Sequence, residues 1–91
     1  MTASLTLAPV LDLKAAEPLK AELLAYRGAD LTIDGASVDR LGGLCLQVLL
    51  SARRTWQADG VNLRLGSVSQ SFVDQWAAFG APAFNTEGGL A

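Results

Sequence analysis

The chain has 91 residues and a formal net charge of −2, from seven lysines and arginines against nine aspartates and glutamates. A chain of this length can build only one compact core, and a hydrophobic content of 51% argues against disorder. The basic residues are scattered and form no stripe, which argues against a nucleic-acid partner. We therefore expect one soluble domain over residues 1–91.

The sequence contains no histidine and a single cysteine, Cys45. It therefore has no imidazole for a catalytic triad, and no internal disulfide or cysteine-based zinc site can form. The amino terminus lacks the features of a signal peptide, and no stretch approaches the ~20 apolar residues of a membrane span. We expect a cytoplasmic protein without enzymatic activity, metal, cofactor or membrane insertion.

Hydrophobic spacing predicts a strand and then a helix in the first third of the chain. Residues 4–7 alternate as in a short strand, which Pro9 ends. Residues 12–26 carry apolar side chains at intervals of three and four, which is typical of a helix. Asp12 is a candidate N-cap, although Pro18 would also suit a helix that starts near Glu17.

The centre of the chain predicts a second strand and the longest helix. Residues 30–34 form a short strand with acidic ends, and residues 35–37 form a loop. Residues 41–56 have a helical stripe, but the first half of this segment is apolar nearly all round. A surface helix of so small a domain should not need that, which suggests a contact with a partner.

The last third of the chain predicts one more strand and one more helix. Residues 61–65 alternate after an Asp-Gly turn, and Ser67 or Ser69 can cap the next helix. The expected buried stripe of that helix is Phe72, Val73, Trp76 and Phe79, and Gly80 ends it. Residues 83–85 either add an edge strand or fray. The order of elements favours an α/β fold.

The segment 31–56 resembles the signature of the STAS domain family, which includes anti-sigma-factor antagonists and the cytoplasmic tails of sulfate transporters. The family pattern is an apolar strand ending in Asp, a short loop, Val, and then Asp-Ser-Ser-Gly-Leu opening an apolar helix. The matching stretch reads Leu31-Thr32-Ile33-Asp34, Gly35-Ala36-Ser37, Val38-Asp39-Arg40-Leu41, Gly42-Gly43-Leu44-Cys45-Leu46 and Gln47-Val48-Leu49-Leu50. The resemblance implies a single STAS-like domain, with a mixed sheet of about four strands and helices mainly on one face.

The resemblance also implies a regulatory, protein-binding function. The run from Cys45 to Trp56 looks most like small STAS proteins of bacterial chemotaxis gene clusters. The implied partner is a histidine kinase or a kinase of the anti-sigma type. One alternative is an accessory subunit of an ABC-type lipid transporter that docks on its ATPase. Another is a homo-oligomer, such as a homodimer, that buries the apolar helix in a self-interface.

The serine that partner kinases phosphorylate in the STAS family has no counterpart here. An ungapped register from Asp34 places Leu44 at the position of that serine, and a register that aligns Asp39 with the signature Asp places Leu41 there. Neither leucine has a hydroxyl, so we expect the usual phosphorylation switch to be lost. Ser37 is the nearest hydroxyl, and either it serves as another phosphorylation site or it caps its loop.

We expect partner binding at the loop and at the start of the central helix. Gly42 and Gly43 would allow close approach of another chain, and a helix amino end would attract an acidic group. The competing interpretation is that the glycines only shape a turn and that the leucines pack inside. Cys45 is expected to be buried and inert, and Asp34 to be a solvated loop end. The candidate partner-binding residues are Ser37, Val38, Asp39, Arg40, Leu41, Gly42, Gly43, Leu44, Leu46, Gln47 and Leu50.

Overall fold

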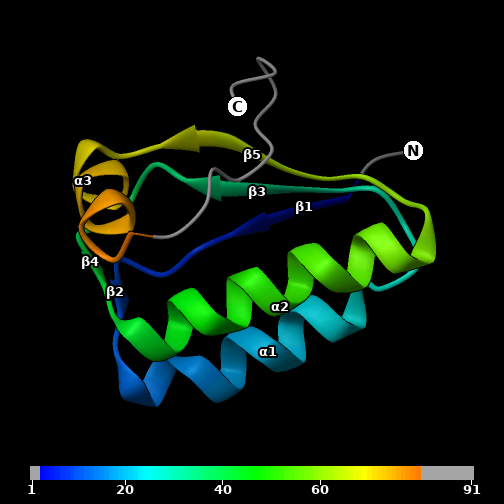
Figure 1. Cartoon of the computed structure of the whole chain (residues 1–91), viewed down its shortest axis with the longest axis horizontal. Helices are drawn as coiled ribbons and strands as arrows, with labels where there is room; N and C mark the ends of the chain where they lie inside the picture. The colour runs from blue at the N-terminus through cyan, green and yellow to red at the C-terminus, as the bar shows by residue number, and fades with distance from the viewer. Residues whose placement is uncertain (1–2, 81–91) are drawn as a thin grey trace.

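A parallel sheet of three strands forms the centre of the molecule (Figure 1). The computed structural model describes residues 3–80. The strands are β1 (Ala3–Thr6), β3 (Leu31–Gly35) and β5 (Leu63–Val68), in the order β1-β3-β5. Ile33 lies in register with Leu5 on one side and Leu65 on the other. All three of these side chains are buried, so they join the strands to one core.

A second, very short pair of parallel strands lies beyond the carboxyl ends of β1 and β3. It joins β2 (Val10–Leu11) to β4 (Arg40–Leu41). The sequence pattern did not predict it, because strands of this length show no periodicity. The expected sheet of about four strands is present as a three-stranded and a two-stranded sheet, and every strand pair within residues 3–80 is parallel, so these residues contain no antiparallel pair of the expected mixed sheet. The possible strand at residues 83–85 lies outside the described residues.

The helices confirm the predicted α/β class. Helices α1 (Ala16–Ala25) and α2 (Gly43–Asp59) run side by side across one face of the sheet, as expected (Figure 1). Helix α3 (Gln70–Ala78) lies at the carboxyl ends of the strands. Because α1 and α2 are the crossovers between successive parallel strands, they return the chain to the same end of the sheet each time.

Asp12 begins the first helical segment, as predicted. Its carboxylate accepts hydrogen bonds from the backbone N–H groups of Lys14 and Ala15, each at 3.1 Å. This cap opens a 3-10 turn, η1 (Leu13–Ala15), which leads directly into α1. Pro18 lies in the first turn of α1, where its missing N–H has no intrahelical partner to lose. Both sequence signals were therefore correct.

The first half of helix α2 is apolar nearly all round, and the helix packs against several elements at once. It contacts α1, η1 and β5. Cys45, Leu46 and Leu49 are all buried, and the Trp56 side chain is only 1% exposed. The Trp56 indole N–H donates a hydrogen bond to the Ala29 carbonyl at 2.8 Å. Core packing thus accounts for most of the apolar surface that had suggested a partner.

Helix α3 buries fewer apolar side chains than the sequence pattern predicted. Phe72 and Trp76 are buried and their rings stack with centroids 5.6 Å apart. The Ser69 hydroxyl accepts a hydrogen bond from the Phe72 N–H and caps the helix, as one of the two predicted capping residues. Val73 and Phe79, which were expected in the buried stripe, are exposed. This second correction changes the candidate site.

An ion pair joins the carboxyl end of α2 to the turn that follows α1. The Arg27 guanidinium contacts both carboxylate oxygens of Asp59, through Nε at 2.9 Å and Nη2 at 3.3 Å. Hydrogen bonding and the charge of Arg27 lower the pKa of the Asp59 carboxyl. The pair is solvent-exposed and adds little stability, but it neutralises the charge of Arg27.

Candidate functional site

The structure divides the predicted partner-binding residues into buried and accessible groups. The side chains of Val38, Leu41 and Leu46 are at most 5% exposed, so they belong to the core and cannot present themselves to a partner. This corrects their inclusion as contact side chains. Gly42 and Leu50 are partly buried. The accessible residues are Ser37, Asp39, Arg40, Gly43, Leu44 and Gln47.

Helix α3 holds the loop that precedes α2. The Gln75 side-chain amide accepts a hydrogen bond from the Leu41 N–H at 2.8 Å and donates one to the Asp39 carbonyl at 3.0 Å. The Ser69 hydroxyl donates to the Val38 carbonyl. Backbone groups of Val38, Asp39 and Leu41 are thus bonded to the side chains of Gln75 in α3 and of Ser69, its N-cap. The position of the loop and the position of α3 are therefore coupled.

Gly42 is the N-cap of α2, and its position has no room for a side chain. Its N–H donates to the Leu11 carbonyl at 2.7 Å, and a Cβ placed on Gly42 would lie 2.8 Å from that same oxygen. No side chain caps the helix here. The first N–H groups of a helix have no intrahelical acceptor, so the amino end of α2 carries a partial positive charge.

The start of α2 favours one of the two possible alignments with the STAS signature. In the ungapped register Gly42 takes the place of the signature Asp, which opens the helix in the family pattern. Leu44 then takes the place of the phosphorylated serine, and its side chain is 48% exposed in the first turn. In the other register that position is Leu41, which is buried within β4. A position modified by a partner must be accessible, so Leu44 fits the signature better.

Phe79 is the residue of this surface that the sequence pattern missed. It lies at the end of α3, is 49% exposed, and its ring atom Cε1 would be 3.6 Å from a Cβ on Gly43. Leu44 follows Gly43 in the chain, so two large exposed apolar side chains flank one exposed glycine. The position of Phe79 next to Gly80 was the available signal, because a residue at a helix end can leave the buried stripe. We call Gly43, Leu44 and Phe79 the α2 amino-end surface.

Cys45 and Asp34 have structural roles. Cys45 is buried, its thiol donates to the Asp12 carbonyl at 3.3 Å, and burial raises its pKa, assisted by the charge of Asp12. A buried thiol with a raised pKa is a poor nucleophile. The Asp34 carboxylate accepts from the Ala36 N–H at 2.9 Å and closes the loop. Over residues 3–80 there is no cluster of three or more candidate metal ligands.

The fold and the site together define a small α/β domain with an accessible apolar patch at a helix start. A family model described as "Mlab, STAS domain" matches residues 2–81. The chain belongs to the STAS domain family. Comparison with curated proteins and with solved structures finds no match. Within residues 3–80, none of the helices has the length and apolar character needed to cross a membrane.

The close approach at Gly42 makes a testable prediction about stability. Gly42→Ala should lower the free energy of unfolding by about 1–3 kcal/mol, because the new methyl group meets a backbone oxygen that cannot move independently. Gly43→Ala is the matched control, since its methyl group would make an ordinary contact with Phe79 and should change stability by less than about 0.5 kcal/mol. Urea unfolding of both variants measures the difference. Equal stabilities would show that Gly42 does not set the start of α2.

Proposed function

We propose that this chain regulates a partner protein by docking through the α2 amino-end surface, without chemistry of its own. STAS domains are in general non-enzymatic, regulatory protein-interaction modules, and the chain belongs to that family. The observation that carries the proposal is the exposure of Leu44 and Phe79 around Gly43. Exposed apolar side chains that gather in one place usually mark an interaction site.

The surroundings of this surface suit a partner that has an apolar contact and an acidic group. The uncapped amino end of α2 offers N–H groups to a carboxylate. Asp39, Arg40 at the start of β4, and Gln47 one turn along α2 supply a polar rim. An apolar centre with a polar rim is the usual anatomy of a protein interface. Ser37 lies on the exposed side of the same loop.

Our first candidate for the partner is an ATP-binding signalling kinase, either a chemotaxis histidine kinase or a kinase of the anti-sigma type. The similarity of residues 45–56 to chemotaxis STAS proteins favours it. Because Leu44 has no hydroxyl, the complex would be controlled by the abundance of the chain or by the state of the partner. A phosphorylated chain is not required in this scheme.

Our second candidate is an accessory subunit that docks on the ATPase of an ABC-type lipid transporter. The missing hydroxyl at Leu44 favours this candidate, because a permanent subunit needs no phosphorylation switch. The matching family model names Mlab and no kinase antagonist, so it adds no support for the kinase. A homo-oligomer is less favoured, because the leucines that had suggested it, such as Leu46, lie in the core.

Capture of the partner from the cells that make this chain tests the docking surface. Leu44→Asp should weaken capture by about tenfold or more, because it places a charge at the centre of an apolar contact. The variant should stay folded, since Leu44 is exposed and an acidic residue is favourable in the first turn of a helix. Mass spectrometry of the Leu44-dependent protein distinguishes a kinase from a transporter ATPase.

Val73→Asp is the matched control for this experiment. Val73 is 44% exposed, which is close to Leu44, but it lies on α3, six residues before Phe79. We expect this control to capture the partner as well as the unmodified chain does. If Leu44→Asp retains the partner while folded, the proposed docking surface is wrong.

The loss of the phosphorylation switch makes a second, independent prediction. The chain isolated from its own cells should have the intact mass of the unmodified polypeptide, because Leu44 offers no hydroxyl. Ser37→Ala should leave this mass spectrum unchanged apart from the substitution. A phosphate that disappears in Ser37→Ala would show that the loop serine had taken over the switch.

A further inference from the structure

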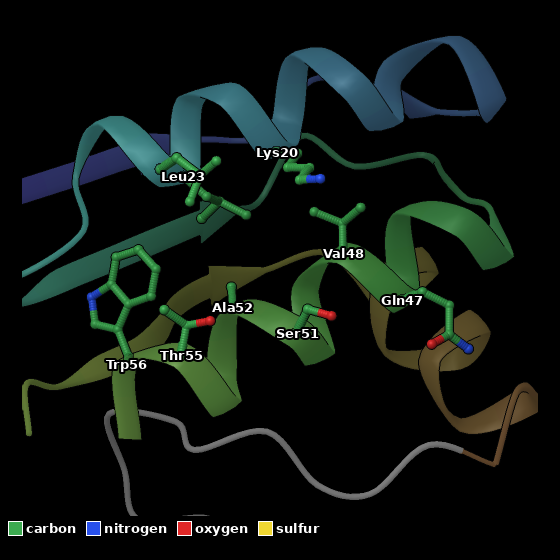
Figure 2. A pocket seen from close by; sticks show the side chains of 9 residues that line it. Lys20, Leu23, Gln47, Val48, Ser51, Ala52, Thr55 and Trp56 are labelled. Carbon is green, nitrogen blue, oxygen red and sulfur yellow. The ribbon is translucent and has the colours of Figure 1, made fainter. Parts of the chain in front are cut away.

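A groove of about 240 Å³ lies between α1 and α2, separate from the α2 amino-end surface (Figure 2). Its floor consists of side chains that also belong to the core, namely Leu23, Ala52 and Trp56. In Figure 2, Leu23 and Lys20 of α1 face Val48 and Trp56 of α2 across the groove. The rim includes exposed residues of both helices, so the groove opens to solvent.

The dimensions of the groove suit protein side chains better than a cofactor. Its volume is below the roughly 300–1,000 Å³ of usual small-molecule pockets. At about 1.5 Å per residue, the stretch of α2 from Val48 to Trp56 is about 12 Å long, or roughly two helical turns. A channel of that length between two parallel helices can accept one face of a helix from another molecule, with apolar anchors at helical spacing.

The charge of the groove indicates which charge the helix of a partner protein must carry. Lys20 is the charged residue that lines it, and no carboxylate does. Within residues 3–80, no acidic side chain forms an ion pair with Lys20. Arg27, in the turn that follows α1, already forms an ion pair with Asp59. A docked helix would therefore meet an unneutralised ammonium group beside an apolar floor.

A second copy of this chain fits the groove poorly. A two-fold interface brings the same patch together from both copies, so neither Lys20 would meet a carboxylate from the residues that line the other groove. The exposed stretch of α2 along the groove, through Gln47 and Ser51, contains no acidic residue to oppose it. A different protein that supplies a carboxylate satisfies the groove better.

We infer that the α1–α2 groove is a second docking site, which binds an amphipathic helix of another protein with apolar anchors and an acidic residue that pairs with Lys20. Gln47 lines one part of the groove and also belongs to the polar rim of the α2 amino-end surface, but Leu44 and Phe79 do not line the groove, so the inference does not rest on the proposed function. A chain with two docking surfaces can join two proteins, or two segments of one protein, at the same time.

Selection of peptides from a library of helix-forming sequences with randomised outer positions tests this inference on the full chain. The enriched peptides should share apolar anchors at i, i+3 or i+4 and i+7 with at least one Asp or Glu. Lys20→Glu should weaken their binding by about tenfold or more, and replacing the peptide carboxylate with Lys should restore it. Lys14→Glu is the matched control, because Lys14 is exposed and does not line the groove.

A second pair of variants tests the location. Ser51→Arg fills the rim of the groove and should abolish binding, whereas Gln57→Arg, on an exposed position of α2 outside the groove, should not. Leu44→Asp should leave peptide binding unchanged, which separates this site from the α2 amino-end surface. Any one of four results would overturn the inference: no enrichment, enriched peptides without acidic residues, binding that persists in Ser51→Arg, or self-association of the chain through groove residues.

Discussion

The contact between Gly42 and the Leu11 carbonyl is the constraint on which the rest of the structure depends. The backbone of Gly42 approaches that oxygen so closely that no side chain fits, and the same N–H completes the short β2–β4 pair. Helix α2 therefore starts at Gly43 and at no earlier residue. This start turns Cys45 and Leu46 into the core and leaves Leu44 outside.

The same constraint explains how one small domain combines a rigid core with an accessible site. The loop before α2 is bonded to Ser69 and Gln75 of α3, so the two sides of the α2 amino-end surface are held together. Phe79 is brought against Gly43 by this arrangement. A partner that contacts Leu44 and Phe79 would meet a preorganised surface and lose little entropy in ordering it.

Local signals in the sequence predicted most of the helices and strands, but not the orientation of the site. Asp12 and Ser69 were recognisable caps, and Gly60, with φ of 73°, ends α2 as a glycine in the left-handed region should. The β2–β4 pair could not be predicted, because it depends on two short segments that are distant in sequence. The apolar first half of α2 did not reveal whether Leu44 or Leu46 faces the core, since a helix without a polar side has no readable stripe.

Hydrogen exchange of the chain, alone and bound to its captured partner, tests the proposed docking surface most directly. The first N–H groups of α2 have no intrahelical acceptor, so they should exchange rapidly in the free chain. Binding at the α2 amino-end surface should slow exchange at residues 43–47 and around Phe79 at the end of α3, and leave β1 and β5 unchanged. Protection confined to the sheet edges or to α1, with no change at the start of α2, would contradict docking at this surface.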